Sequence, residues 1–149
     1  MGLIQSFVDN VLREKVTPII GSMVYCDLLA IEKHSGIYVG NNQIVHLQGD
    51  GNIAMVTPER FLGAPINPAI SIYVSCNGTT AVGSSEVAAR AKNMVGNKRK
   101  YNVILDNCHQ FTSGCLTGDF ENNDNFILFV KHTAENILNA NTWRVWEID

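Results

Sequence analysis

The sequence has no long run of apolar residues and little charge. None of its apolar stretches reaches the roughly 20 residues that a membrane-spanning helix needs, and none has the form of a secretory signal peptide. We therefore expect a cytoplasmic protein. Charged residues make up 17% of the 149 residues, and the net charge is −3. Because no dense basic cluster offsets this balance, we expect no nucleic-acid partner.

The sequence also has few cysteines, and their spacing does not match a disulfide framework. The four cysteines stand at positions 26, 76, 108 and 115, and no two of them form a Cys-x-x-Cys pair. This spread is more typical of reduced thiols than of a small disulfide-bonded domain.

What the sequence does contain is enough apolar residues for one core. Hydrophobic residues make up 46% of the chain, and neither a repeat nor a linker divides it, so we predict a single α+β domain over residues 1–149. Residues 3–14 have helical apolar spacing. We expect this helix to dock on the core, with peripheral membrane contact as the alternative. Met1 to Ser6 matches a myristoylation pattern at Gly2, which is short enough to arise by chance.

Turn-forming residues divide the rest of the chain into short elements. A Gly-Asn-Asn turn and a Gln-Gly-Asp-Gly-Asn turn separate apolar stretches of strand length. We predict strands over 21–30, 34–39, 43–47, 53–56 and 70–74, a helical turn over 57–62 capped by Thr57, helices over 85–95 and 126–138, and a last strand or a disordered end over 143–148. In the last helix we expect Phe126, Phe129, Val130, Ala134, Ile137 and Leu138 to face the core.

Residues 101–118 are the stretch around which the chain is organised. We predict a short strand over 103–105, a break at Asp106 and Asn107, and a helix that begins near Cys108. The thiolate is the reactive form of cysteine, and the positive end of a helix favours it. Cys108 is therefore a candidate nucleophile, whereas we place Cys115, two helical turns later, in the core.

The turn at residues 40–42 sets the alignment of the two strands beside it. If it is a three-residue loop, Val39 pairs with Gln43, and Gly36 then faces His46. A slip of one residue would turn one strand over, so this register is a testable prediction.

In this register His34 and His46 are diagonal neighbours on one sheet face, roughly 7–8 Å apart at the backbone. A cysteine nucleophile needs a base, and the base needs a third group to orient it. We predict that His34 accepts the Cys108 proton and that His46 orients His34. His109 points about 100° away from Cys108 on a helix, which suits a supporting or surface residue. A Cys-His-His zinc site is an alternative, but the spacing matches no common zinc signature, so we expect no metal or cofactor.

Two short blocks resemble a known family. The first comprises His34-Ser-Gly-Ile-Tyr-Val-Gly40 and Ile44-Val-His-Leu47, and the second comprises Asn107-Cys-His-Gln-Phe111 and Cys115-Leu-Thr-Gly118. They are similar to the lecithin:retinol acyltransferase-like family, in the permuted branch of the NlpC/P60 superfamily. The resemblance covers about residues 20–118, which would form the core of the domain between flanking helices.

The resemblance implies a permuted papain-like α+β fold, with an antiparallel sheet packed against helices. Position by position, it implies that Cys108 is the nucleophile and that His34 and His46 are the catalytic histidines. The usual Asn-Cys-Glu-His-Phe block differs here, because His109 replaces the glutamate and Gln110 the histidine. The chain also ends without the membrane anchor of many family members, so membrane-embedded lipids are less expected as substrates.

We therefore expect acyl transfer or hydrolysis through a thioester on Cys108, acting on lipid-type esters or amides. The Cys108 backbone amide would help to bind the oxyanion. Action on peptides as an amidase or endopeptidase is the first alternative, although an enzyme for cell-wall peptides would need export. A non-catalytic interaction module is the second, and the complete Cys-His-His set argues against it. The sequence gives no indication of the oligomeric state.

Overall fold

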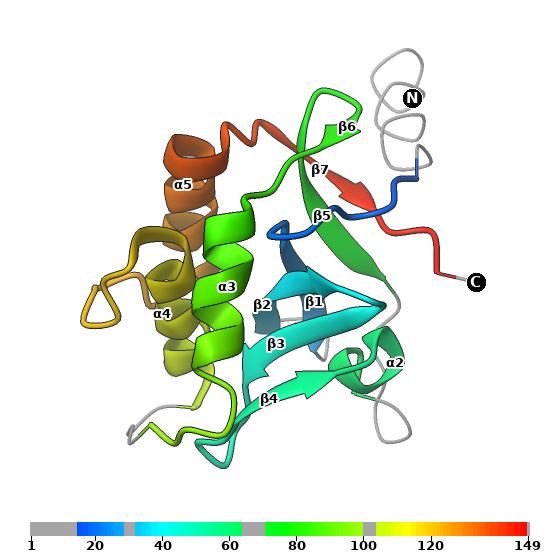
Figure 1. Cartoon of the computed structure of the whole chain (residues 1–149). Helices are drawn as coiled ribbons and strands as arrows, with labels where there is room; N and C mark the ends of the chain where they lie inside the picture. Colours follow the sequence, from blue (N-terminus) through cyan, green and yellow to red (C-terminus); the bar gives the residue numbers. More distant parts are fainter. Residues whose placement is uncertain (1–14, 29–31, 64–70, 100–103, 149) are drawn as a thin grey trace.

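The computed structural model describes residues 15–28, 32–63, 71–99 and 104–148. Within them, an antiparallel sheet of seven strands lies against three helices, and a fourth, short helix lies beside β3 and β4 (Figure 1). The described elements are β1 (Met23–Leu28), β2 (Glu32–Gly40), β3 (Gln43–Leu47), β4 (Ile53–Val56), α2 (Pro58–Phe61), β5 (Ile72–Asn77), β6 (Thr80–Ala81), α3 (Ser85–Asn93), α4 (Ile104–Thr117), α5 (Ile127–Leu138) and β7 (Thr142–Val145). This is the predicted α+β fold.

The sheet has the order β4-β3-β2-β1-β5-β6, and β7 pairs with β5. All pairings between these strands are antiparallel. The strands predicted over 43–47 and 53–56 coincide with β3 and β4. The strand predicted over 70–74 begins later and extends to residue 77, and the last strand is β7 rather than residues 143–148.

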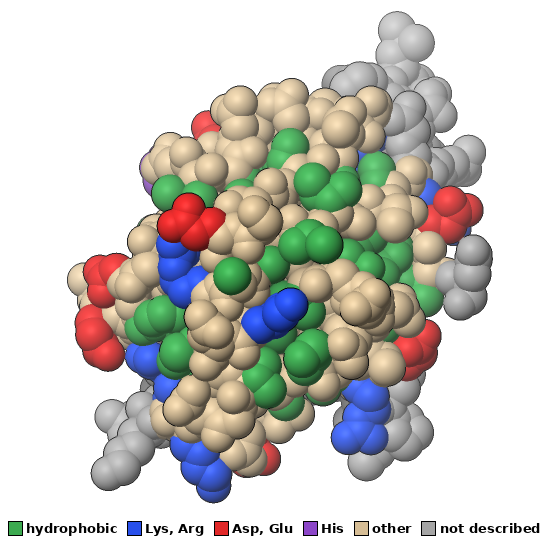
Figure 2. Space-filling view, in the orientation of Figure 1, with side chains coloured by type: hydrophobic (Ala, Val, Ile, Leu, Met, Phe, Trp, Pro, Cys, Tyr) green, Lys and Arg blue, Asp and Glu red, His purple; other side chains and the backbone are tan. Residues whose placement is uncertain are grey.

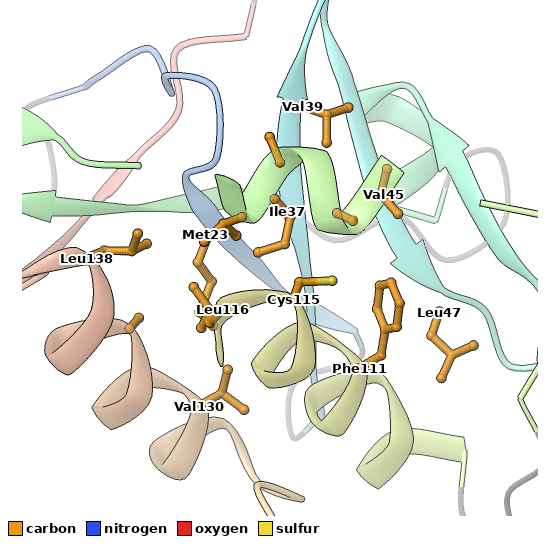
Figure 3. Close-up of a cluster of buried hydrophobic side chains, with 14 of the residues drawn as sticks. Met23, Ile37, Val39, Val45, Leu47, Phe111, Cys115, Leu116, Val130 and Leu138 are labelled. Atoms are coloured by element: carbon orange, nitrogen blue, oxygen red, sulfur yellow. The ribbon is translucent and has the colours of Figure 1, made fainter. Parts of the chain in front are cut away.

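The two faces of the sheet support separate apolar clusters. On one face, alternate strand residues pack against α3, α4 and α5, as Figure 3 shows for Met23, Ile37, Val39, Val45 and Leu47 beside Phe111, Cys115, Leu116, Val130 and Leu138. On the other face, a smaller cluster forms from Val24, Cys26, Ile44, Phe61, Ile72, Val74 and Trp146. Alternation of side chains along each strand places successive residues in different clusters.

The turn between β2 and β3 is shorter than predicted. Gly40 pairs with Gln43 across a two-residue turn, in which Asn41 and Asn42 have φ of 53° and 59°. Positive φ at both central positions suits the twist of a tight hairpin, and asparagine tolerates it. The predicted pairing of Val39 with Gln43 is therefore wrong.

A shift of register between Tyr38 and Gly40 compensates for the turn being one residue shorter than predicted. Beyond it, Ile37 pairs with Val45, and this alignment continued by one residue sets Gly36 opposite His46. An extra residue on one strand forms a bulge that restores the pairing further along. The predicted register of the segment that bears the histidines is thus confirmed, although the turn that was expected to set it is not.

The largest error concerns the segment before Cys108. Helix α4 begins at Ile104, so Asp106 and Asn107 lie inside the helix, and the predicted strand is wrong at Ile104 and Leu105. Val103 lies outside the described residues. A run of three apolar residues fits a strand and a buried helical turn equally well. Phe111 and Cys115, four residues apart and both fully buried, continue the helical face that decides the outcome.

The predicted Thr57 cap is present, but one predicted apolar face is not. Thr57 caps α2, where its hydroxyl accepts from the Arg60 amide at 3.3 Å, and Ser84 caps α3. In α5 the buried residues are Val130, Ala134 and Leu138, whereas Phe126, Phe129 and Ile137 are 60%, 52% and 45% exposed. One narrow stripe of α5 suffices for packing, so the wider apolar face expected here is wrong.

The predicted helix over 3–14 lies outside the described residues. Among the helices described, none is both long enough and apolar enough to cross a membrane. On the face shown in Figure 2, acidic and basic side chains are interspersed, and hydrophobic side chains lie between them in small groups.

Candidate active site

The imidazole rings of His34 and His46 are in direct contact. His34 on β2 and His46 on β3 are 8% and 7% exposed, and His34 Nε2 lies 2.5 Å from His46 Nδ1. Their ring centroids are 4.8 Å apart with an interplanar angle of 75°. The prediction that the two rings share one face of the sheet is confirmed.

Phe61 of α2 forms a wall beside both histidines. Its ring centroid lies 5.0 Å from that of His34 and 5.5 Å from that of His46, and its side chain is 1% exposed. The phenyl ring excludes water from the imidazoles and restricts their rotation. A capped helical turn was predicted here, but nothing in the sequence indicated that Phe61 packs on the histidine pair.

Burial keeps both imidazoles uncharged near neutral pH. The pKa of His34 is lowered well below the ordinary 6.5, chiefly by burial and further by the charges of His46 and His109. Burial also lowers the pKa of His46 to about 4, and the Asp50 carboxylate opposes this effect. A neutral imidazole is the form that can accept a proton from a thiol.

The hydrogen bond between the rings limits their tautomers. One proton lies between the two nitrogens, so when His34 donates from Nε2, its Nδ1 is the basic nitrogen, and His46 carries its own proton on Nε2. Among the described side chains, His46 Nε2 is the one buried nitrogen or oxygen without a hydrogen-bond partner. An unpartnered polar atom beside a cavity is a feature that functional sites often retain.

Cys108 and the two histidines line one cavity of about 550 Å³. Cys108 is 2% exposed and comes from α4. The structure therefore brings together the three residues that the sequence motifs single out. The remaining lining residues are Leu47, Gln48, Gly49, Asp50, Arg60, Phe61 and Gly63.

The rim of this cavity contains charges that sequence reasoning missed. Asp50 and Arg60 both line it. The Asp50 carboxylate accepts from the backbone amide and from the side-chain amide of Asn52, each at 2.9 Å, and these bonds lower its pKa. The polar turn that begins at Gln48, just after β3, was the available signal, since residues just beyond a strand that carries a candidate histidine lie near that histidine.

The position of Cys108 on α4 alters one expectation. The first four amides of a helix have no partner within it, and Cys108 is the fifth residue of α4. Its amide is therefore not among these four, and the expectation that Cys108 stands at the helix start and offers a free amide to an oxyanion is wrong.

The other three cysteines lie in different surroundings. All four are reduced thiols, and all four are buried. Burial raises the pKa of Cys115 well above its ordinary value, and it raises that of Cys76 as well. Cys115 lies in the core, as predicted. In the part of the chain that the structure describes, no group of three or more His, Cys, Asp or Glu side chains is placed to hold a metal ion.

His109 is not a surface residue. It is 4% exposed, and its Nδ1 lies 2.8 Å from the Ser35 hydroxyl, which donates to Thr112 at 2.9 Å. The surface alternative for His109 is therefore wrong. The next residue, Gln110, exchanges two hydrogen bonds with Asn122, at 2.8 and 3.0 Å.

Comparison with known proteins supplies a family for this arrangement. The sequence model of the family described as lecithin retinol acyltransferase matches residues 17–121. This span contains both histidines of the pair and Cys108. A search of curated proteins finds no match to the chain.

Proposed function

Because the chain belongs to the lecithin retinol acyltransferase family, we propose that it is a thiol acyltransferase or hydrolase that works through a thioester on Cys108. The family supports acyl-transfer chemistry in general, and the cavity supports this assignment of residues. The observation that carries the proposal is that a buried thiol and two neutral, hydrogen-bonded imidazoles line one cavity.

In the first half of the reaction, His34 accepts the proton of the Cys108 thiol. The sulfur then attacks the carbonyl carbon of an ester or amide, and the carbonyl oxygen becomes an oxyanion. When the tetrahedral intermediate collapses, the bond to the alcohol or amine breaks. His34 returns its proton to this leaving group, and a thioester remains on Cys108.

The second half repeats these steps with an acceptor. Water, an alcohol or an amine gives a proton to His34 and attacks the thioester carbonyl. The carbon–sulfur bond breaks, the sulfur takes the proton back, and an acid, an ester or an amide leaves the site. The choice between hydrolysis and transfer depends on which acceptor reaches the thioester first.

His46 would act on His34 and not on the substrate. When His34 holds the extra proton, its Nε2–H donates to His46 Nδ1, which fixes the orientation of the ring. The Asp50 carboxylate raises the pKa of His46, so it favours positive charge on the pair. This arrangement corresponds to the orienting group of a catalytic triad, with an imidazole in place of the usual carboxylate.

The cavity suits a substrate with an apolar part and a polar part. A volume of about 550 Å³ lies within the range of small-molecule sites. Leu47 and Phe61 offer apolar contacts, whereas Asp50 and Arg60 offer charge. These features favour a lipid-type ester or amide as the acyl donor, met in the cytoplasm or at a membrane surface.

The test is intact-mass spectrometry after incubation with mixed phospholipids and, separately, with a panel of peptides. We expect the mass of one acyl chain to be added to the protein and located on Cys108 by peptide mapping. Cys108→Ala should gain no mass, and Cys76→Ala should gain it as the unmodified sequence does. An adduct only with peptides would favour the amidase alternative. No adduct and no turnover with either panel would leave the interaction module as the better description.

A further inference from the structure

A chain of buried hydrogen bonds links the strand that carries His34 to the helix that carries Cys108. The hydroxyl of Ser35, the neighbour of His34 on β2, lies 2.8 Å from His109 Nδ1 and 2.9 Å from Thr112 Oγ1. The Thr112 hydroxyl donates to the backbone carbonyl of Cys108 at 2.9 Å. All three side chains of this link are at most 4% exposed.

The direction of every bond in this link can be assigned. A hydroxyl has one proton. Thr112 gives its proton to the Cys108 carbonyl, so its oxygen accepts from Ser35. Ser35 has then used its own proton, so its oxygen must accept from His109, which carries a proton on Nδ1. Each hydroxyl donates once and accepts once, and such fully satisfied buried chains are rigid.

Apolar packing alone would not fix the place of Cys108 as closely. Phe111 and Cys115 hold α4 against the sheet by contacts without preferred direction. Hydrogen bonds weaken steeply as distance and angle change. The link from Ser35 is made to the same helical turn that bears Cys108, and it starts one residue from His34.

We propose that His109 is a positioning residue, which acts through Ser35 and Thr112 to set the place of the Cys108 sulfur relative to His34. This inference rests on the proposed function, because it matters only where Cys108 and His34 exchange a proton. A displacement of about 1 Å in a reacting pair can lower a rate by roughly 100-fold. Loss of a hydrogen bond in this link should therefore lower the reactivity of the Cys108 thiol.

The test measures the rate of alkylation of Cys108 by iodoacetamide from pH 5 to 9, with mass spectrometry to assign the label. Thr112→Val and His109→Leu remove donors from the link. We expect each to lower the rate constant at pH 7 by about 10-fold and to move the pH profile toward that of an ordinary thiol. Thr112→Ser and His109→Asn keep a donor in place and should recover most of the rate.

Two matched controls separate the link from general loss of stability. Thr117→Val removes the same kind of helical hydroxyl bond, since Thr117 donates to the Ser113 carbonyl four residues earlier at 3.0 Å. Ser75→Ala removes a buried strand serine that bonds Met23 and Val82 instead of α4. Both should keep the alkylation rate and pH profile of the unmodified sequence, whatever they cost in thermal stability.

The outcomes separate the two proposals. If Cys108 in the unmodified sequence is alkylated no faster than Cys76 or Cys115, the proposed function fails and the inference falls with it. If Cys108 is fast and stays fast in Thr112→Val and His109→Leu, only the inference is overturned. Nitrogen-15 NMR provides a test without substitution: we expect the proton of His109 on Nδ1, and a proton on Nε2 alone would overturn the link.

Discussion

Mild acid should destabilise this fold through the buried histidine pair. An unfolded chain protonates His46 near pH 6.5, whereas the folded chain does so only near its lowered pKa of about 4. Between these values the unfolded state binds more protons, so stability is fully present above pH 6.5 and is lost as the pH falls toward about 4. At about 1.4 kcal/mol per unit of pKa, His46 accounts for a loss of about 3 kcal/mol. The lowered pKa of His34 acts in the same direction.

The measurement is urea unfolding at a series of pH values between 7.5 and 4, for the unmodified sequence and for His46→Gln. Glutamine does not titrate, so the variant lacks the contribution of His46 but retains those of all carboxylates. We expect the free energy of unfolding to fall by about 3 kcal/mol more in the unmodified sequence than in His46→Gln. His132→Gln, which alters an exposed histidine of α5, should follow the unmodified sequence.

A difference below about 1 kcal/mol between the two curves would refute the reasoning. Such a result would mean that the folded protein accepts a proton on His46 almost as readily as the unfolded chain does. The imidazole pair would then be solvated or already charged near neutral pH, and His34 would not be the neutral base that the proposed mechanism needs.

Three further predictions concern single residues. Cys108→Ala should abolish turnover and keep the free energy of unfolding, whereas Cys115→Ala should keep turnover and lower the free energy of unfolding by about 1–2 kcal/mol. Enzyme kinetics and urea unfolding curves measure both effects. The reverse pattern would show that Cys108 is not the nucleophile. His34→Ala should lower kcat by at least about 100-fold, whereas His46→Asn should retain partial activity through a replacement hydrogen bond, and equal losses would contradict the separate roles. Gly114→Ala should lower the free energy of unfolding by about 1–3 kcal/mol, because the added Cβ would overlap the ring of Phe120. An unchanged melting temperature would contradict this packing of Phe120 on α4.

The sequence was most informative where local chemistry decides the structure. Turn residues bound β3 on both sides and precede β4, which ends at the Thr57 cap of α2, so these strands coincide with the prediction. The histidine pair could be placed because side chains alternate along a strand, and only the parity of the register has to be right. The predicted placement of the histidines is therefore right although the predicted turn is wrong, since the bulge before Gly40 restores the predicted register.

Non-local packing decided the features that the sequence did not predict. The apolar face of α5 is wider than the stripe that the core accepts, and only a neighbouring helix can determine which residues are covered. The link through Ser35, His109 and Thr112 joins side chains more than 70 positions apart. Each of these residues alone is an ordinary polar residue, and their chemistry becomes specific only when strand and helix meet.

The start of α4 changes where the reactivity of Cys108 would originate. The potential at a helix end acts mainly within its first turn, and Cys108 lies in the second turn of α4. In the proposed mechanism, the helix dipole therefore contributes less to a thiolate than the sequence suggested, and more of the activation would come from the neutral imidazole of His34. A thiol activated by a base is sensitive to the position of that base, whereas one activated by a helix end is not. For this reason the packing of β2 against α4, which sets the position of His34 relative to Cys108, would affect the reaction as strongly as the identity of the three site residues.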